Sequence, residues 1–195
     1  QFDQIYHEHM SYLGIAPMQK YLAQWGMELI HTLSSAVHGG SMMFFAAKIG
    51  ERTPTFSVGD CMRREDETFK MGLLERFISR ADSCIVELRA LVESLTDNGR
   101  FIDLYGVTAK SNTLLHACGI ADRIRLATDG SALKHGKYLP GSDTRILTKA
   151  QWHADPADYA LLGAWNYATE ILAEEKQYRD LGVKFVIPVP VPRFA

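Results

Sequence analysis

The clearest pattern of hydrophobic and polar positions lies in the middle of the chain. From Leu74 to Leu95, apolar residues recur at steps of three and four positions, which places them on one stripe of an α-helix. Asn98-Gly99 follows and predicts the end of that helix, because glycine readily takes the left-handed conformation of a C-terminal cap. A less regular helix is predicted at 58–70. Residues 51–98 are therefore predicted to form a helical connector.

Short apolar runs and amphipathic stretches alternate after Gly99. Alternation of this kind is typical of a parallel sheet with helices on both faces, so residues 99–195 are predicted to form an α/β domain with a mainly parallel sheet. The predicted strands are Phe101–Tyr105, Ile124–Thr128, Tyr159–Ala164 and Lys184–Pro188, and the predicted helices are Asn112–Cys118 and Tyr167–Leu181.

The first section, residues 1–50, is predicted to be a short α/β segment. Pro17–Gly26 has the proline and glycine positions of a short helix. Met27–Leu33 and Met42–Ala47 read as two antiparallel strands joined by a glycine-containing turn.

Composition narrows the function classes. The 195 residues are 47% apolar and 23% charged with a net charge of -2, and the basic residues form no patch, so nucleic acid is not an expected partner. No apolar run approaches the roughly 20 residues of a membrane span. Cys61, Cys84 and Cys118 lie far apart without metal-ligand spacing, which favours reduced thiols in a cytoplasmic protein. The chain starts at Gln1 without a methionine, and we expect it to be a fragment.

Polar, glycine and proline residues follow each predicted strand of the third section. Ligands of parallel sheets bind beyond the carboxyl ends of the strands, so this edge is the predicted binding edge. The segments concerned are Gly106–Lys110, Asp129–Ser131, Trp165-Asn166 and Pro188–Pro190.

A dense polar cluster, Tyr6-His7-Glu8-His9 with Tyr12 nearby, opens the chain. Histidine can accept a proton near neutral pH, a carboxylate can orient it, and a tyrosine hydroxyl can stabilise an oxyanion. A surface loop with incidental histidines is the competing interpretation. A metal site is a third interpretation, since His7 and His9 are separated by one residue and would point to the same side of an extended segment.

Three further segments have both a binding and a structural interpretation. Gly106–Thr113 fits either an atypical phosphate loop with Lys110 or a plain helix cap. Asp129 and the loop Lys134–Gly141 fit either hydroxyl and phosphate binding or a solvated turn. Val37–Ser41 needs no role beyond a hairpin turn.

Taken together, these segments resemble the nucleotide-sugar C-methyltransferases of deoxysugar pathways. The resemblance covers nearly the whole chain in order. It rests on Phe2–His9 with Ser11-Tyr12, Val37–Ser41, Tyr105–Leu115, Lys134–Gly141, Ala164–Asn166 and Pro188–Pro190.

The resemblance implies a three-part enzyme: a zinc lobe, an S-adenosylmethionine domain and a Rossmann-like domain that anchors the nucleotide-linked sugar. This chain would hold the tail of the middle domain (1–50), the connector (51–98) and the third domain (99–195). The other domains of the same chain are then its partners, with zinc confined to the missing lobe and no cofactor bound to this fragment, which is expected to be inactive alone.

The resemblance also implies residue roles. His9 matches the base that removes a proton beside the carbonyl of a 4-keto-sugar, with Glu8 as its partner and Tyr6 near the sugar; His7 has no assigned role. A non-catalytic nucleotide-binding or assembly module is the alternative function. The substrate-binding residues implied are Tyr12, His38, Lys110, Asn112, Thr113, Asp129, Lys134, Lys137, Trp165 and Asn166.

Overall fold

A computed structural model describes residues 2–35 and 40–195. The chain packs as two compact units, one formed by Gln1–Glu8 with Arg80–Ala195 and the other by His9–Ser79. One boundary therefore falls inside the Tyr-His-Glu-His segment, between Glu8 and His9. Among the described residues, no helix is both long and apolar enough to span a membrane.

The larger unit is built on a six-stranded sheet with the order β5-β4-β3-β6-β7-β8. All neighbouring strands are parallel except the pair β7 and β8, so the predicted mainly parallel sheet is confirmed. Within this sheet, the chain first forms the central strand β3 and then adds β4 and β5 on one side of it. It then crosses to the other side of β3 and adds β6, β7 and β8. The strands are β3 (Ile102–Tyr105), β4 (Ala127–Thr128), β5 (Ile146–Leu147), β6 (Tyr159–Leu162), β7 (Lys184–Ile187) and β8 (Arg193–Phe194).

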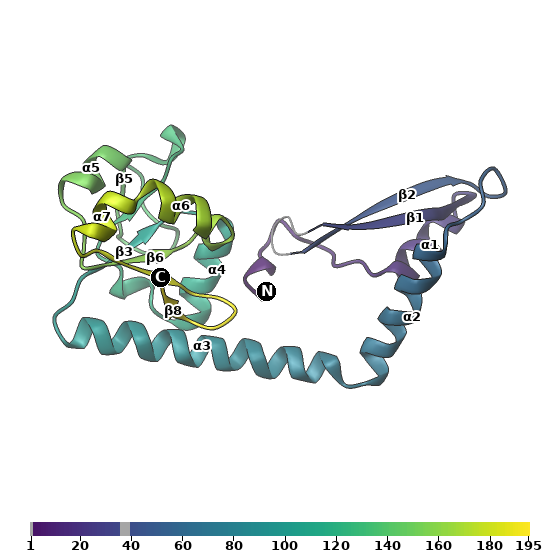
Figure 1. Cartoon of the computed structure of the whole chain (residues 1–195), viewed down its shortest axis with the longest axis horizontal. Coiled ribbons are helices and arrows are strands. Elements are labelled where there is room, and N and C mark those ends of the chain that lie inside the picture. Colours follow the sequence, from purple (N-terminus) through teal and green to yellow (C-terminus); the bar gives the residue numbers. More distant parts are fainter. Residues whose placement is uncertain (1, 36–39) are drawn as a thin grey trace. The chain divides into compact units, whose positions relative to one another are not determined.

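Helices cover both faces of this sheet, as predicted (Figure 1). Side chains of a strand alternate between its faces, and in β3 Leu104 joins a core under α3 (Leu73–Asp97) and α4 (Ala109–Cys118). Its neighbour Tyr105 joins the opposite core, which includes Trp152 of α5 (Lys149–Ala154) and Ile171 of α6 (Ala168–Glu174). The α6 helix and the next helix α7 (Lys176–Asp180) lie on that second face.

The prediction of one helix over Tyr167–Leu181 is wrong, because the helix is interrupted at Glu175 between α6 and α7. Glu175 is 1% exposed, and its carboxylate accepts hydrogen bonds inside the unit, which the straight helix pattern did not anticipate. The predicted strand Ile124–Thr128 is also shorter, at Ala127–Thr128. The sequence did not predict β5, α5 or the antiparallel β8.

The long helix α3 is continuous from Leu73 to Asp97, which confirms the central prediction of the sequence. Gly99 has a φ of 73°, and the Arg100 amide donates to the Leu95 carbonyl at 3.1 Å, so the predicted glycine cap is present. The upstream helix is also present, as α2 (Phe56–Lys70).

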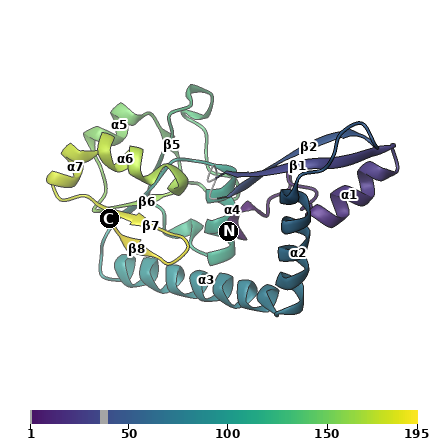
Figure 2. The same cartoon turned by 45° about the vertical axis from the view of Figure 1, so that its right-hand side comes forward.

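The smaller unit has an antiparallel hairpin, β1 (Met27–Ser35) and β2 (Ser41–Lys48), as predicted (Figure 2). Helix α1 (Ile15–Ala23) begins two positions before the predicted Pro17. Ile15, Leu29 and Val58 form the small core that holds α1, β1 and α2 together. Short 3-10 helices complete the chain: η1 (Phe2–Gln4), η3 (Ala121–Arg123), η4 (Ala132–Lys134) and η5 (Trp165–Tyr167).

Candidate functional site

A cavity of about 290 Å³ lies at the carboxyl ends of β3 and β4, beside the turn that follows β6. The sheet order reverses at β3, and open α/β sheets bind ligands at such a reversal. The cavity therefore lies on the edge that the sequence predicted. Its lining residues are Tyr105, Gly106, Thr108, Thr128, Asp129, Gly130, Lys149, Ala164, Tyr167, Ile171 and Glu174.

The turn after β3 is held closely against the turn after β6. A Cβ atom added at Gly163 would lie 2.0 Å from the Gly106 carbonyl oxygen, and one at Gly106 would lie 2.8 Å from the Ala164 Cβ. The Thr108 hydroxyl also donates to the Gly163 carbonyl at 3.0 Å. The backbones of the two turns thus lie in close contact at the reversal of strand order, beside the cavity.

Helix α4 begins with a capping box at that turn. The Thr108 side chain accepts from the Ser111 amide at 3.0 Å, and the Ser111 hydroxyl accepts from the Thr108 amide at 2.9 Å. The Val107 amide donates to the Asp129 carboxylate at 2.8 Å. These amides are satisfied within the protein, so the geometry favours the plain helix cap over the phosphate loop.

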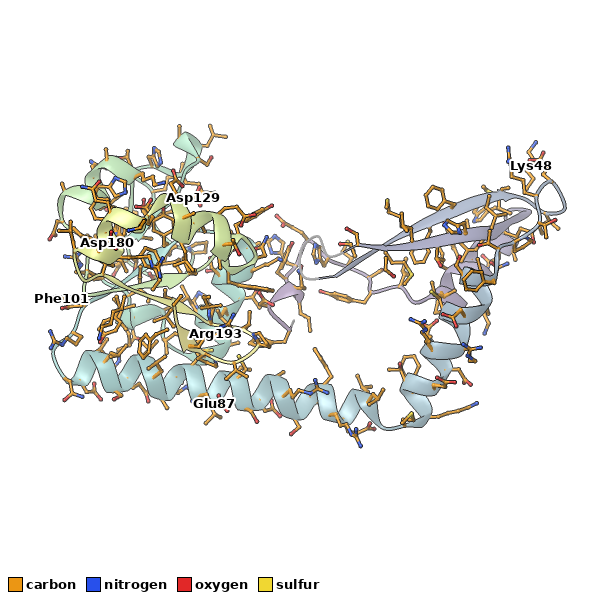
Figure 3. The ribbon with its side chains drawn as sticks, viewed as in Figure 1. Lys48, Glu87, Phe101, Asp129, Asp180 and Arg193 are labelled. Atoms are coloured by element: carbon orange, nitrogen blue, oxygen red, sulfur yellow. The ribbon has the colours of Figure 1, made fainter. Side chains whose placement is uncertain are left out.

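Asp129 braces the cavity edge (Figure 3). Its Oδ2 accepts from the Lys134 ammonium at 3.0 Å, and its Oδ1 accepts from the Ser131 amide at 2.8 Å. Lys134 also donates to the Val107 carbonyl at 2.6 Å. The structure therefore brings Asp129 and Lys134 together, as a paired charge that fixes the loop after β4.

The opposite side of the cavity contains a charge network that the sequence reasoning missed. The Lys149 ammonium lies 2.5 Å from the Glu174 carboxylate and 2.7 Å from the Glu175 carboxylate. The Tyr105 hydroxyl donates to the Glu175 carboxylate at 2.6 Å, and His153 Nε2 lies 2.8 Å from the same group. The missed signal was local, because Thr148 and Gln151 form a capping box that marks the start of α5 just before Lys149.

The network perturbs the pKa of three of its members. Burial opposes ionisation of Glu175, yet the hydrogen bonds from Lys149, Tyr105 and His153 outweigh it and lower its pKa. Burial likewise opposes the charge of Lys149, but bonds to the two glutamates raise its pKa. Burial and the bond to Glu175 raise the pKa of Tyr105. The cavity wall thus holds a charged lysine–carboxylate group and a neutral tyrosine at neutral pH.

Lys110 and Trp165 meet away from the cavity lining. The Lys110 ammonium lies 5.3 Å from the centre of the Trp165 ring, and the Trp165 indole donates to Asp3 Oδ2 at 2.6 Å. Lys110 is 8% exposed, and burial lowers its pKa, partly offset by Asp3. Asn112 Oδ1 and Lys110 Nζ are buried with no hydrogen-bond partner among residues 2–35 and 40–195.

The Tyr-His-Glu-His segment forms a turn at His7 and Glu8 rather than an extended strand. The metal-site interpretation assumed an extended segment, in which His7 and His9 point to the same side, so the structure does not support it. His7, Glu8 and His9 are exposed and Tyr6 is half-buried. The His9 and Tyr12 rings contact edge to face, with centroids 6.2 Å apart. A base and a tyrosine are therefore accessible on this segment.

The remaining predicted substrate residues have varied surroundings. The Thr113 hydroxyl donates to the Ala109 carbonyl within α4 at 3.3 Å. Lys137 is exposed on the loop after η4, and Asn166 is half-buried in η5. His38 lies outside the described residues.

Comparison with known proteins identifies the family. Residues 36–190 match the family described as the C-methyltransferase C-terminal domain. The chain belongs to this C-methyltransferase family. It is also 34% identical over 197 residues to the C-methyltransferase NovU of Streptomyces niveus, an alignment that covers 99% of this chain. The chain spans about half the length of that curated relative, 47%.

Family membership implies S-adenosylmethionine as methyl donor, but this Rossmann-like sheet does not fit it. The turn after β3 has one glycine, its amides are bonded within the protein, and the Gly163 backbone packs closely against it. In the part of the chain that the structure describes, no three His, Cys, Asp or Glu side chains converge as a metal site.

Proposed function

We propose that this chain is the substrate-holding C-terminal part of an S-adenosylmethionine-dependent C-methyltransferase that acts on a nucleotide-linked 4-keto-deoxysugar. The observation that carries the proposal is the cavity at the reversal of strand order, in a chain of the C-methyltransferase family. The substrate and the chemistry go beyond the family assignment and are our inference.

The cavity suits the nucleoside end of such a substrate. Its volume of about 290 Å³ is at the lower end of ligand pockets, roughly 300–1,000 Å³, so we expect it to hold one moiety rather than the whole molecule. Tyr167 lines the cavity and offers an aromatic face. The carboxylates of Asp129 and Glu174 are already paired with lysines, so the wall does not repel a neighbouring diphosphate strongly.

The diphosphate needs cations beyond the paired ones. Lys137 is exposed on the loop that Asp129 and Lys134 hold in place, and we assign it to the diphosphate. Lys110, Asn112 and Asn166 remain proposed contacts to the rest of the substrate.

The chemistry assigned to this chain is proton removal. The carbon next to the 4-keto group loses its proton to the His9 imidazole, and the electron pair moves to the carbonyl oxygen to give an enolate. Glu8 orients the imidazole and Tyr6 donates to the oxyanion. S-adenosylmethionine supplies the methyl group when it is bound, and we place that site in the part of the enzyme outside this chain.

Calorimetry on the isolated chain tests the binding half of the proposal. We expect dTDP, UDP or GDP to bind and S-adenosylmethionine to bind poorly. Gly130 lines the cavity with no atom within 4 Å of an added Cβ, so Gly130→Leu should fill the cavity and abolish nucleotide binding. Gly59→Leu, a similarly open site on α2, is the matched control and should bind normally. Donor binding without nucleotide binding would reverse the assignment.

His9→Asn in the full-length enzyme tests the catalytic half. Loss of a general base costs on the order of 10²–10⁴-fold in rate, and we expect this loss in kcat with KM little changed. Exchange of the sugar proton with deuterated solvent, without methyl donor, reports the same step. A variant that exchanges and methylates at the parent rate excludes His9 as the base. Nucleotide binding without exchange by the parent enzyme would favour the non-catalytic binding module.

A further inference from the structure

Asp3 makes a buried contact that ties the first residues of the chain to the Rossmann-like unit. Its side chain is 0% exposed, and its Oδ2 accepts a hydrogen bond from the Trp165 indole at 2.6 Å, across 162 positions of sequence. The 3-10 helix η1, which contains Asp3, packs on α4, and Phe2 packs against the core beneath the sheet. A carboxylate acceptor makes this hydrogen bond stronger and shorter than a neutral one.

Lys110 supplies the charge that makes the buried carboxylate tolerable. Its ammonium lies over the same Trp165 ring, at 5.3 Å from the centroid, and interacts electrostatically with Asp3. Trp165 thus lies between a buried anion on η1 and a buried cation on α4. An unpaired buried charge is costly, and the attraction of Lys110 offsets part of the cost of burying Asp3, while Asp3 Oδ1 and Lys110 Nζ have no hydrogen-bond partner within the described residues.

Trp165 does not line the cavity itself, but its neighbours in the sequence do. The residue before it, Ala164, and the residue two positions after it, Tyr167, both line the cavity. The Trp165 ring packs against the hydrophobic cores on both faces of the sheet. A displacement of the indole therefore moves the turn that borders the bound ligand.

We infer that Asp3 is a positioning residue, which fixes the segment carrying Tyr6 and Glu8 to the turn at Trp165 and so aligns that segment with the substrate. Tyr6 follows Asp3 by three positions, and the described segment between them is a turn without a strand or a long helix to hold it. Asp3 is thus the buried anchor nearest to this part of the proposed catalytic segment. The inference rests on the proposed function.

The test uses Asp3→Ala, Asp3→Asn and Trp165→Phe in the full-length enzyme. A misplacement of about 1 Å can cost on the order of 10²-fold in rate, so we expect Asp3→Ala and Trp165→Phe to lower kcat and proton exchange by about that factor. The KM for the nucleotide-linked sugar should change little in Asp3→Ala. Trp165→Phe changes a residue that the resemblance assigns to the substrate, so it is judged by kcat and proton exchange alone. Asparagine keeps an acceptor oxygen, so Asp3→Asn should recover part of the rate. The double variant Asp3→Ala/Trp165→Phe should be no slower than the slower single one, because one contact is lost in both.

Asp143→Asn, an exposed carboxylate of the same unit, is the control and should behave as wild type. The contact itself is read in the isolated chain by NMR, where the Trp165 indole proton should lose its protection from exchange in Asp3→Ala. An Asp3→Ala enzyme with normal kcat, or a loss confined to KM, overturns the positioning role. A wild-type enzyme that neither binds the nucleotide-linked sugar nor exchanges its proton overturns the proposed function instead.

Discussion

Glu175 should be one of the most sensitive positions of the Rossmann-like unit, and Glu175→Gln tests this. The carboxylate is 1% exposed and meets three donors: Tyr105 at 2.6 Å, Lys149 at 2.7 Å and His153 at 2.8 Å. Glutamine has one acceptor oxygen, so its amide N–H groups would face at least one of these donors. The variant therefore loses the charge that pairs with Lys149, and the His153 ring must change tautomer to accept from the new amide.

Breaking a buried ion pair costs roughly 3–5 kcal/mol. Lys149 keeps Glu174 and its side chain is 31% exposed, so solvent screens part of the loss and we expect the lower end, about 3 kcal/mol. At roughly 2–4 °C per kcal/mol for a chain of this size, the melting temperature should fall by about 6–12 °C.

Urea and thermal unfolding at pH 7, followed by circular dichroism, measure this loss. Glu174→Gln is the matched control, since Glu174 pairs with the same lysine but is 65% exposed, and it should cost no more than about 1 kcal/mol. Equal losses in the two variants would refute the view that burial, rather than pairing with Lys149, gives Glu175 its importance.

Two further predictions concern the same unit. Gly163→Ala would place its Cβ 2.0 Å from the Gly106 carbonyl oxygen, so the backbone must shift and the free energy of unfolding should fall by about 1–3 kcal/mol or more. Gly130→Ala, where an added Cβ meets no atom within 4 Å, is the control and should change stability little. Equal melting temperatures of the two variants would contradict this. The folded-state pKa of Glu175 is depressed below its ordinary 4.5, so its contribution is complete above that pH and is lost as the pH falls below it. Wild type should therefore keep its stability advantage over Glu175→Gln from neutral pH down to about 4.5 and lose it in more acid solution, and an advantage independent of pH would exclude Glu175 as the group.

The sequence determined those parts of the fold that depend on local periodicity. The stripe from Leu74 to Leu95 gave α3, the apolar runs gave β3, β6 and β7, and the glycine after Asn98 gave the helix end, because each pattern is repeated within one segment. The same reasoning located the edge of the sheet where the cavity lies, since polar residues follow the strands of a parallel sheet.

Only the tertiary structure decided which side chains meet at that edge. The two-residue strands β5 and β8 are too short to leave a periodic pattern, and they exist because neighbouring strands offer hydrogen-bond partners. The buried surroundings of Glu175 at the break depend on donors from Tyr105 and His153, which come from other elements. Asp3 and Trp165 are 162 positions apart, so their bond follows from packing, which brings distant residues together with no signal in either local segment.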